Sequence, residues 1–213
     1  GDRYFYVNPL EVWPENCKAS TSMSHVKPVS QEWFSCACCP PNIARTLASL
    51  GQYIFAEDEK SVYVNQFISS SLRTSVSGTD VTLRLDAGYM RDGCVRLTIE
   101  SSSAHAFTVR VRIPPYFKKP VFRLEGKEIS PVVENGYAVL AISRAGEQTF
   151  TLCGDVKPEF FAANEQVRAD LGKVALVMGP YVYCLEETDN GNNLACVYAK
   201  PSEIGRASCR ERV

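Results

Sequence analysis

Apolar and polar residues alternate along several short segments between residues 61 and 154. A period of two places successive side chains on opposite faces of a strand, so each segment predicts a half-buried β-strand. Short stretches rich in glycine, proline, asparagine and aspartate separate the segments and predict turns. The seven predicted strands are 61–76, 80–89, 93–101, 107–114, 121–126, 137–143 and 148–154. Together they predict an antiparallel β-sandwich with one face of each sheet buried.

A helical period precedes these strands. Between residues 40 and 56 the apolar positions lie three or four residues apart, which is the spacing of one face of an α-helix. These positions are Ile43, Leu47, Leu50 and Ile54. Pro40 and Pro41 open the segment, where a missing backbone N–H does no harm. We therefore expect one amphipathic helix over residues 40–56.

The patterns divide the chain into four parts. Residues 1–56 are an end piece with a helix, 57–159 form the sandwich, and 160–202 begin a second β unit. Within this unit, the long apolar run in 167–190 suggests a more completely buried strand pair that turns at Gly179-Pro180. The tail, residues 203–213, has no apolar periodicity and resembles an in-frame translation of a sequencing adapter, so we expect it to form no part of the fold. We expect the chain to be truncated at both ends.

Composition excludes some classes of partner. The chain has 213 residues, 45% hydrophobic, with 23 Lys and Arg against 24 Asp and Glu and a net charge of −1. No basic field is available for phosphates, so nucleic acid is not an expected partner. No apolar run approaches the roughly 20 residues of a membrane helix, so a membrane is not expected either. The first residues resemble the middle of a folded domain, which leaves the compartment open.

Eight cysteines precede the tail. The chain is too long and too regular for a disulfide scaffold, so we expect unpaired structural thiols. Cys94, Cys153 and Cys184 lie in apolar, strand-like runs, where a free cysteine behaves as a small buried hydrophobe. Free thiols favour a reducing compartment such as the cytoplasm.

The stretch "SCACCPPN", residues 35–42, concentrates three of these cysteines directly before the predicted helix. Adjacent cysteines do not easily form a disulfide with each other, whereas Cys38 and Cys39 can both reach one metal ion. The positive end of a helix dipole favours a thiolate, which suits a metal ligand and a nucleophile equally. Inert packing of Cys36 and one neighbour is the third alternative. Spacing alone leaves all three open.

Other candidates are weaker. His25 and His105 lie in polar stretches, so we expect both to be solvated loop residues. Glu186 and Glu187, with Asp189, resemble a carboxylate pair, but adjacent residues of a strand point to opposite faces. They predict a charged strand end.

Longer stretches carry a specific resemblance. Their order and spacing are similar to those of the β-L-arabinofuranosidases of glycoside hydrolase family 127, over nearly all of residues 3–192. The stretches are "YFYVNPLE", "WFSCACCPPNIARTLASLGQYIF", "VYVNQFISS", "RVRIPPY" and "GKVALVMGPYVYCLEETDN". The resemblance implies a mixed fold, in which residues 1–56 close a catalytic (α/α)6 barrel and antiparallel β-sandwich domains follow.

The resemblance also implies a chemistry. In this family a zinc-bound cysteine is the nucleophile of a retaining glycosidase, which makes Cys38 the nucleophile and a zinc ligand, and Cys39 a second zinc ligand. The other ligands, a glutamate and a cysteine, and the general-acid glutamate lie upstream of "YVNPL" in the family. Glu11, Glu15 and Glu32 do not match their motifs. Tyrosines in the segment of Tyr6 face the sugar pocket in relatives, which implies the same position for Tyr6, although a barrel-core role is at least as compatible with it.

Two hypotheses follow. In the first, the chain is a carboxy-terminal fragment, inactive alone, of an enzyme that acts on an arabinose-containing oligosaccharide or glycoconjugate. In the second, it is a carbohydrate-binding or structural β-sandwich module whose cysteines only pack. The natural substrate and linkage, the oligomeric state, the compartment and the role of Cys36 stay open.

Overall fold

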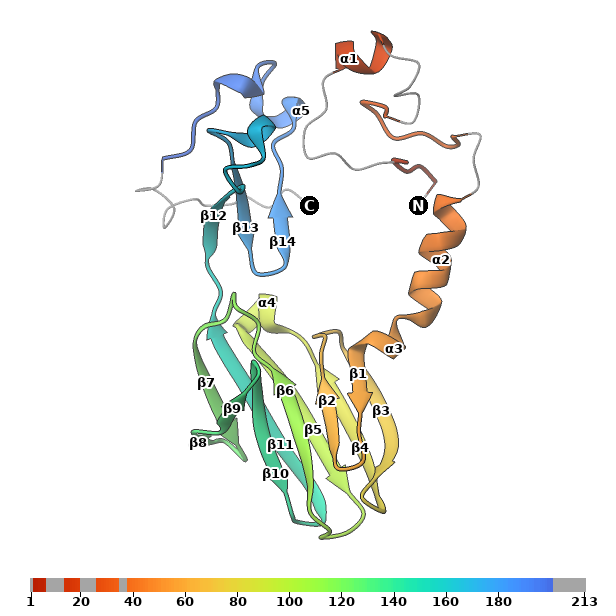
Figure 1. Ribbon diagram of the computed structural model, residues 1–213, viewed down its shortest axis with the longest axis vertical. Helices are drawn as coiled ribbons and strands as arrows, with labels where there is room; N and C mark the ends of the chain where they lie inside the picture. The colour runs from red at the N-terminus through yellow and green to blue at the C-terminus, as the bar shows by residue number, and fades with distance from the viewer. Residues whose placement is uncertain (1, 7–13, 20–25, 35–37, 201–213) are drawn as a thin grey trace. The chain divides into compact units, whose positions relative to one another are not determined.

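The described residues are predominantly β-structure with a few short helices (Figure 1). The computed structural model describes residues 2–6, 14–19, 26–34 and 38–200. The chain divides into two compact units, 1–51 and 52–213. No helix of the described residues is long and apolar enough to span a membrane. His25, Cys36 and the tail 203–213 lie outside the described residues.

The first unit contains the helices α1 (Pro14–Ala19) and α2 (Cys39–Ser49). The expected helix over 40–56 begins one residue early and is interrupted near Leu50, whose N–H bonds to the carbonyl of Leu47. A short helix, α3 (Gly51–Ile54), follows, and Phe55–Glu57 is the strand β1. The end of the predicted helix was therefore wrong, because Phe55 pairs with Val64 of a neighbouring strand and this pairing overrides the helical period.

Two sheets make the predicted sandwich. The five-stranded sheet has the order β1-β2-β6-β10-β9, with β2 (Ser61–Val64), β6 (Phe107–Arg112), β10 (Tyr137–Ile142) and β9 (Val132–Glu134). The six-stranded sheet has the order β3-β4-β5-β11-β7-β8, with β3 (Ser70–Val76), β4 (Thr79–Asp86), β5 (Cys94–Ser101), β11 (Gly146–Asp155), β7 (Lys118–Leu124) and β8 (Lys127–Ile129). All strand pairs are antiparallel except β2 with β6, which is parallel because a long crossover through the other sheet separates them.

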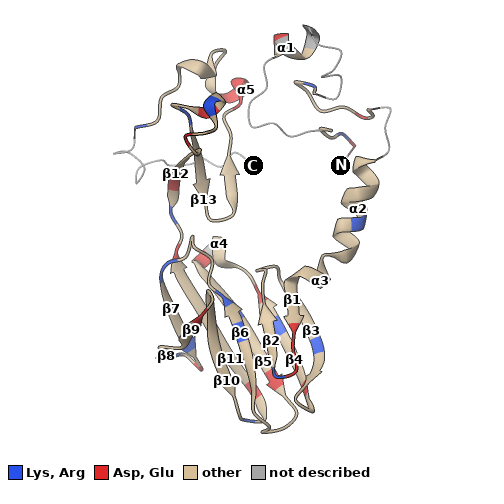
Figure 2. Cartoon of the chain, viewed as in Figure 1, with Lys and Arg blue, Asp and Glu red and all other residues tan. Residues whose placement is uncertain are grey.

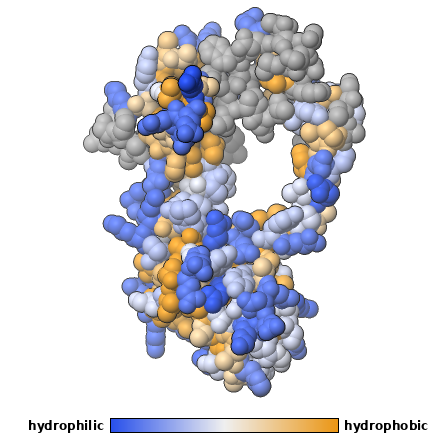
Figure 3. Space-filling model, in the orientation of Figure 1, coloured by the Kyte–Doolittle hydropathy of each residue, from blue (hydrophilic) through white to orange (hydrophobic). Residues whose placement is uncertain are grey.

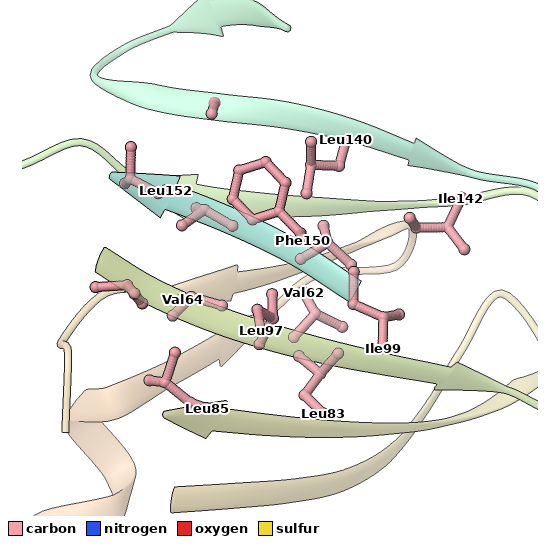
Figure 4. Packing of buried hydrophobic residues seen from close by; sticks show 14 of the residues in the cluster. Val62, Val64, Leu83, Leu85, Leu97, Ile99, Leu140, Ile142, Phe150 and Leu152 are labelled. Atoms are coloured by element: carbon pink, nitrogen blue, oxygen red, sulfur yellow. The ribbon is translucent and has the colours of Figure 1, made fainter. Parts of the chain in front are cut away.

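The core lies between these two sheets. Val62 and Val109 of the five-stranded sheet are fully buried, as are Leu83, Leu97 and Phe150 of the six-stranded sheet. The side chains of Val62, Leu97 and Phe150 point toward one another across the sandwich (Figure 4). Alternate residues on each strand fill this core, as the period of two predicts.

Some predicted strands have different limits. The segment 61–76, expected as one strand, contains β2 and β3 in different sheets, because residues 65–69 cross from one sheet to the other. The end of the strand predicted over 80–89 forms part of the short helix α4 (Tyr89–Asp92). The short strands β8 and β9 were not predicted. Each has only three residues, too few for a recognisable alternation.

A third sheet follows, with β12 (Pro158–Ala162), β13 (Val174–Met178) and β14 (Tyr181–Tyr183). The predicted turn at Gly179-Pro180 joins β13 to β14, and Gly179 has a φ of +58°, which a glycine adopts readily. The prediction that this pair is more completely buried was wrong, since no residue of the three strands is buried. The predicted charged strand end at Glu187 and Asp189 is instead the short helix α5 (Glu187–Asn190). The remaining helical turns are η2 (Arg168–Asp170) and η3 (Leu194–Cys196).

The cysteines of the β-region differ from the expectation. Cys94 and Cys153, predicted as unpaired buried thiols, form a disulfide, and Cys184 is exposed. The pairing arises because the register of β5 and β11 places Cys94 directly opposite Cys153, although 59 residues separate them in the chain. Both side chains point away from the core, because their neighbours Val95 and Leu152 point into it. The expectation of a reducing compartment depended on unpaired thiols and loses that support.

Candidate active site

Two segments of the first unit come together around Phe34. An isolated antiparallel bridge joins Tyr4 to Gln31 through two backbone hydrogen bonds of 2.9 Å. The rings of Tyr4 and Tyr6 pack against the buried Phe34, with centroids 5.2 and 5.6 Å away. This aromatic contact holds the side chain of Tyr6 in place.

The start of α2 holds the backbone of Cys38. Cys38 immediately precedes the helix, and its carbonyl accepts hydrogen bonds from the backbone N–H of Asn42 at 3.2 Å and from Nδ2 of Asn42 at 2.7 Å. Nη2 of Arg45 donates to Oδ1 of Asn42 at 2.9 Å. Pro40 and Pro41 lie in the first turn, where their fixed φ favours helix initiation. The backbone of Cys38 is therefore held at the first turn of α2.

Tyr6, Cys38 and Cys39 form one cluster. The Tyr6 hydroxyl and the Cys38 thiol share a hydrogen bond of 2.8 Å. The two sulfur atoms are 3.9 Å apart, and Sγ of Cys39 lies 3.8 Å from the backbone oxygen of Tyr6. Cys38 is exposed and Cys39 is half-buried, and neither forms a disulfide. The geometry leaves one sulfur accessible and the other sheltered.

Cys38 and Cys39 lie at the amino-terminal end of α2. No acidic residue occupies the first turn of α2, and Arg45 is the single charged residue of this helix (Figure 2). The positive end of the helix dipole therefore acts on the sulfurs without an opposing carboxylate in that turn. Within the described ranges, no group of three or more His, Cys, Asp or Glu side chains is arranged to hold a metal ion.

The sequence-predicted candidates divide into two groups. Tyr6, Cys38 and Cys39 come together, while their roles stay predictions. Glu15 lies in α1, and Glu32 forms an exposed ion pair with Arg3 at 3.2 Å. His105 is an exposed residue between strands, as expected.

Asn42 and Arg45 were not singled out from the sequence. The signal that could have found Asn42 is its position four residues after Cys38, at the first turn of a proline-initiated helix. Arg45 follows three residues later on the same helix face and holds the Asn42 side chain.

Several groups of the second unit have shifted pKa values. The backbone N–H of Lys60 and the hydroxyl of Tyr63 donate to the Asp58 carboxylate and lower its pKa, and the same bond to Asp58 raises the pKa of Tyr63. Burial raises the pKa of both Tyr89 and Tyr116. Their neighbours are tyrosines and surface ion pairs, which explains the shifts without a catalytic role.

Models of three domains of one family match the chain. The β-L-arabinofuranosidase GH127 catalytic domain matches residues 1–52, the GH127 middle domain matches 61–152, and the family 127 C-terminal domain matches 158–208. The chain belongs to glycoside hydrolase family 127. Tyr6, Cys38 and Cys39 all lie within residues 1–52, the part of this family 127 chain that matches the catalytic domain.

Individual relatives support the same assignment. A non-reducing end β-L-arabinofuranosidase of Bifidobacterium longum is 34% identical over 200 residues, covering 91% of this chain and 30% of the relative. The crystal structure of a GH127 β-L-arabinofuranosidase from Geobacillus stearothermophilus T6 is 43% identical with a TM-score of 0.83, covering 92% of this chain and 31% of that one. A further GH127 β-arabinofuranosidase structure is 30% identical with a TM-score of 0.66, covering 75% of this chain and 28% of that one. The family 127 chain thus spans about a third of the length of these relatives.

Proposed function

We propose that the intact protein carrying this chain is a retaining glycoside hydrolase that releases L-arabinofuranose from β-L-arabinofuranosides, with Cys38 as its nucleophile. The observation that carries the proposal is the cluster of Tyr6, Cys38 and Cys39 inside the catalytic-domain match. The substrate class rests on the relatives, two of which are named as β-L-arabinofuranosidases. An arabinose-containing oligosaccharide or glycoconjugate is therefore the proposed partner.

Zinc is the metal that suits the two sulfurs. Two thiolates about 2.3 Å from one zinc ion in tetrahedral geometry are roughly 3.8 Å apart. The observed separation of 3.9 Å between the sulfurs of Cys38 and Cys39 agrees with this value. Soft thiolate donors also select zinc over magnesium or calcium. Cys38 and Cys39 would hold the ion together with ligands from outside the described residues, and a bound zinc would keep the sulfurs deprotonated at neutral pH.

The proposed reaction has two displacement steps. The thiolate of Cys38 attacks the anomeric carbon, the bond to the leaving oxygen breaks, and that oxygen takes a proton from a general acid. A water molecule then attacks the same carbon and gives one proton to the conjugate base of the general acid, while the carbon–sulfur bond breaks and Cys38 is released as a thiolate. Two inversions at one carbon retain the β configuration.

Tyr6 positions the nucleophile in this proposal. Its hydroxyl lies 2.8 Å from the sulfur of Cys38, so it donates a hydrogen bond when the cysteine is a thiolate. Phe34 holds the Tyr6 ring, and Asn42 holds the carbonyl of Cys38. The sulfur is therefore oriented from two directions before the sugar arrives.

The polar contact of Cys38 favours this proposal over a non-catalytic β-sandwich module. A cysteine that only packs behaves as a small hydrophobe, whereas the sulfur of Cys38 shares a hydrogen bond of 2.8 Å with the Tyr6 hydroxyl. A glutamate and a cysteine at metal-ligand spacing in the coding sequence upstream would support the enzyme, and their absence would support the module.

The first experiment compares Cys38→Ser with the unchanged intact enzyme on an aryl β-L-arabinofuranoside. We expect a loss of at least about 1000-fold in kcat, because a serine hydroxyl is not a thiolate. Cys184→Ser, an exposed cysteine outside the cluster, is the matched control and keeps full activity. Mass spectrometry of the acid-quenched enzyme should find one pentosyl group on the Cys38 peptide. Retained turnover in Cys38→Ser would overturn the assignment.

The second experiment tests the 213-residue chain by itself. The proposed general acid and remaining zinc ligands are not among its candidates, so we expect no arabinose release above background. Release by this chain alone would show that its own residues suffice.

A further inference from the structure

The disulfide between Cys94 and Cys153 lies on the outer face of the six-stranded sheet. Cys94 is the first residue of β5 and Cys153 is near the end of β11, and the two are direct register partners with Cα atoms 4.1 Å apart. Each residue is only partly buried. Its outward, partly exposed position leaves the bond accessible to a dissolved thiol, unlike a disulfide enclosed in the core.

The charges around the two sulfurs are unequal. Nη1 of Arg123, on β7, lies 3.7 Å from the sulfur of Cys153. On the other side, Asp92 accepts a hydrogen bond from the backbone N–H of Cys94 at 3.1 Å and pairs with Arg96 at 2.6 Å. Among the residues that the structure describes, Arg123 has no carboxylate partner at salt-bridge distance. Its guanidinium charge is therefore available to stabilise a thiolate on Cys153.

The bond lies where β11 leaves the sandwich. The register of β11 with β7 shifts between Cys153 and Asp155, and Gly154 between them packs closely on Phe117. Just beyond, Val156 lies next to Gly179 in the turn of the third sheet. The disulfide thus joins β11 to β5 two residues before Asp155, the last residue of β11 that pairs with β7.

We propose that Cys94 and Cys153 are a thiol–disulfide exchange site that controls how firmly the end of β11 is held to the sandwich. The reactant is a dithiol or a thiol of low molecular weight. In the oxidised state the disulfide holds in place the segment that leads from β11 to the third sheet. In the reduced state the core between the sheets stays intact, while the junction from residue 153 to 158 opens more often.

The exchange proceeds in two steps. The incoming thiolate bonds to the sulfur of Cys94, the bond between Cys94 and Cys153 breaks, and the electron pair stays on Cys153 beside Arg123. A second thiolate then attacks the reagent's sulfur in the mixed disulfide, and Cys94 leaves as a thiolate. The protein gains two electrons and, with two protons from water, two thiols, while two reagent thiols become one disulfide.

The experiment follows this exchange in the whole chain at neutral pH. Free thiols of the native protein are first alkylated, glutathione or dithiothreitol is then added, and newly formed thiols receive a second label of different mass. We expect native-state reduction by millimolar dithiothreitol, and a glutathione adduct found mainly on Cys94. A pair that is reduced only in denaturant, or an adduct found mainly on Cys153, would overturn the proposal.

Two variants test the electrostatic step. Arg123→Gln should slow reduction about three- to tenfold, because the leaving thiolate of Cys153 loses its cation. Arg84→Gln removes an arginine from the same outer face that pairs with Glu100 and Glu147, and should leave the rate unchanged. Equal rates for Arg123→Gln and the unchanged chain would contradict the role of Arg123.

Hydrogen exchange tests the structural consequence. On reduction, amides in residues 118–121 and 153–158 should lose protection, whereas those in 95–99 and 148–152 should keep it. An unchanged pattern, or loss of protection throughout the sandwich, would contradict a local effect at the junction. If native protein kept in oxidised glutathione holds both cysteines as free thiols, the exchange site itself is refuted.

Discussion

Helix α2 and the β-sandwich both follow an apolar period, but only the sandwich buries its apolar residues. Twelve large side chains of the sandwich are fully buried between its two sheets (Figure 4). Helix α2 has no buried residue, and Ile43 and Leu47 are 57% and 65% exposed. Hydrophobic surface is visible along this helix (Figure 3). A helical period therefore predicts the element but not what covers it.

The buried core and the proposed catalytic cysteines therefore lie in different regions of the chain. The sandwich has its own core and carries no residue of the proposed catalytic cluster. Cys38 and Cys39 stand at the start of a helix whose apolar side is exposed in this chain. Because packing supplies most of the stability of a helix in a protein, the proposed nucleophile lies on the less stable of the two regions.

The comparison predicts its largest effect at Phe150. This side chain is fully buried and stacks on Phe122 with centroids 6.3 Å apart. Phe150→Ala should lower the free energy of unfolding by about 3–5 kcal/mol, because it leaves a cavity in a closed core. Urea unfolding of the whole chain, followed by far-UV circular dichroism, measures the change. Phe161→Ala, on a side chain that is 53% exposed, is the control and should change it by less than about 0.5 kcal/mol. A cost below about 1 kcal/mol for Phe150→Ala would mean that the core is not closed.

A smaller effect is expected at Gly154. A Cβ added there would lie 2.7 Å from Cβ and Cγ of Phe117 and 3.0 Å from its backbone Cα, so the backbone would have to shift. Gly154→Ala should cost about 1–3 kcal/mol, as overpacking does. Gly51→Ala is the matched control, because its Cβ would meet nothing within 4 Å and alanine favours the helix. Calorimetric melting of both variants tests the pair, and equal melting temperatures would contradict the tight packing at Gly154.

Sequence patterns predicted the elements better than their limits or partners. The alternation over 93–101 and 148–154 locates β5 and β11, but it contains no information on register. The Cys94–Cys153 pair depends on that register, so it was missed. The crossing between sheets at residues 65–69 was missed because this stretch contains no glycine or proline to mark a break between two strands.

In the candidate site too, local features were predicted from the sequence and contacts between distant residues were not. Adjacent cysteines before a proline-initiated helix were visible in the sequence, because all of these features are local. The contact of Tyr6 with Cys38 joins residues 32 positions apart and was not predicted, because the family resemblance related Tyr6 only to the sugar pocket. The support of Asn42 and Arg45 became visible only with the helix in place.

Alkaline pH should act on the sandwich through Tyr116. Burial, followed by the charge of Tyr89, raises the pKa of Tyr116 in the folded state, whereas the unfolded value is near 10. Its contribution to stability is therefore complete below about pH 10 and is lost as the pH rises above that value, because the unfolded chain releases the proton first. Tyr116→Phe should reduce the fall in stability between pH 9 and 11, measured by urea unfolding at each pH. Tyr181→Phe, on an exposed side chain, is the control. An identical fall in Tyr116→Phe would exclude this tyrosine as its source.

The smallest effect is expected on α2, at Leu47. Its side chain is 65% exposed, so Leu47→Ala removes almost no buried contact, and alanine is at least as good a helix former as leucine. In this chain the substitution should change the free energy of unfolding by less than about 0.5 kcal/mol and leave the helical dichroism unchanged. The family resemblance implies that α2 belongs to a catalytic barrel in the intact enzyme, and this expectation predicts a different result there. There the same substitution should cost about 2–5 kcal/mol if the barrel covers Leu47. Equal, small effects in both proteins would mean that the exposed side of α2 stays uncovered, and the contrast with the sandwich would then be a property of the helix itself.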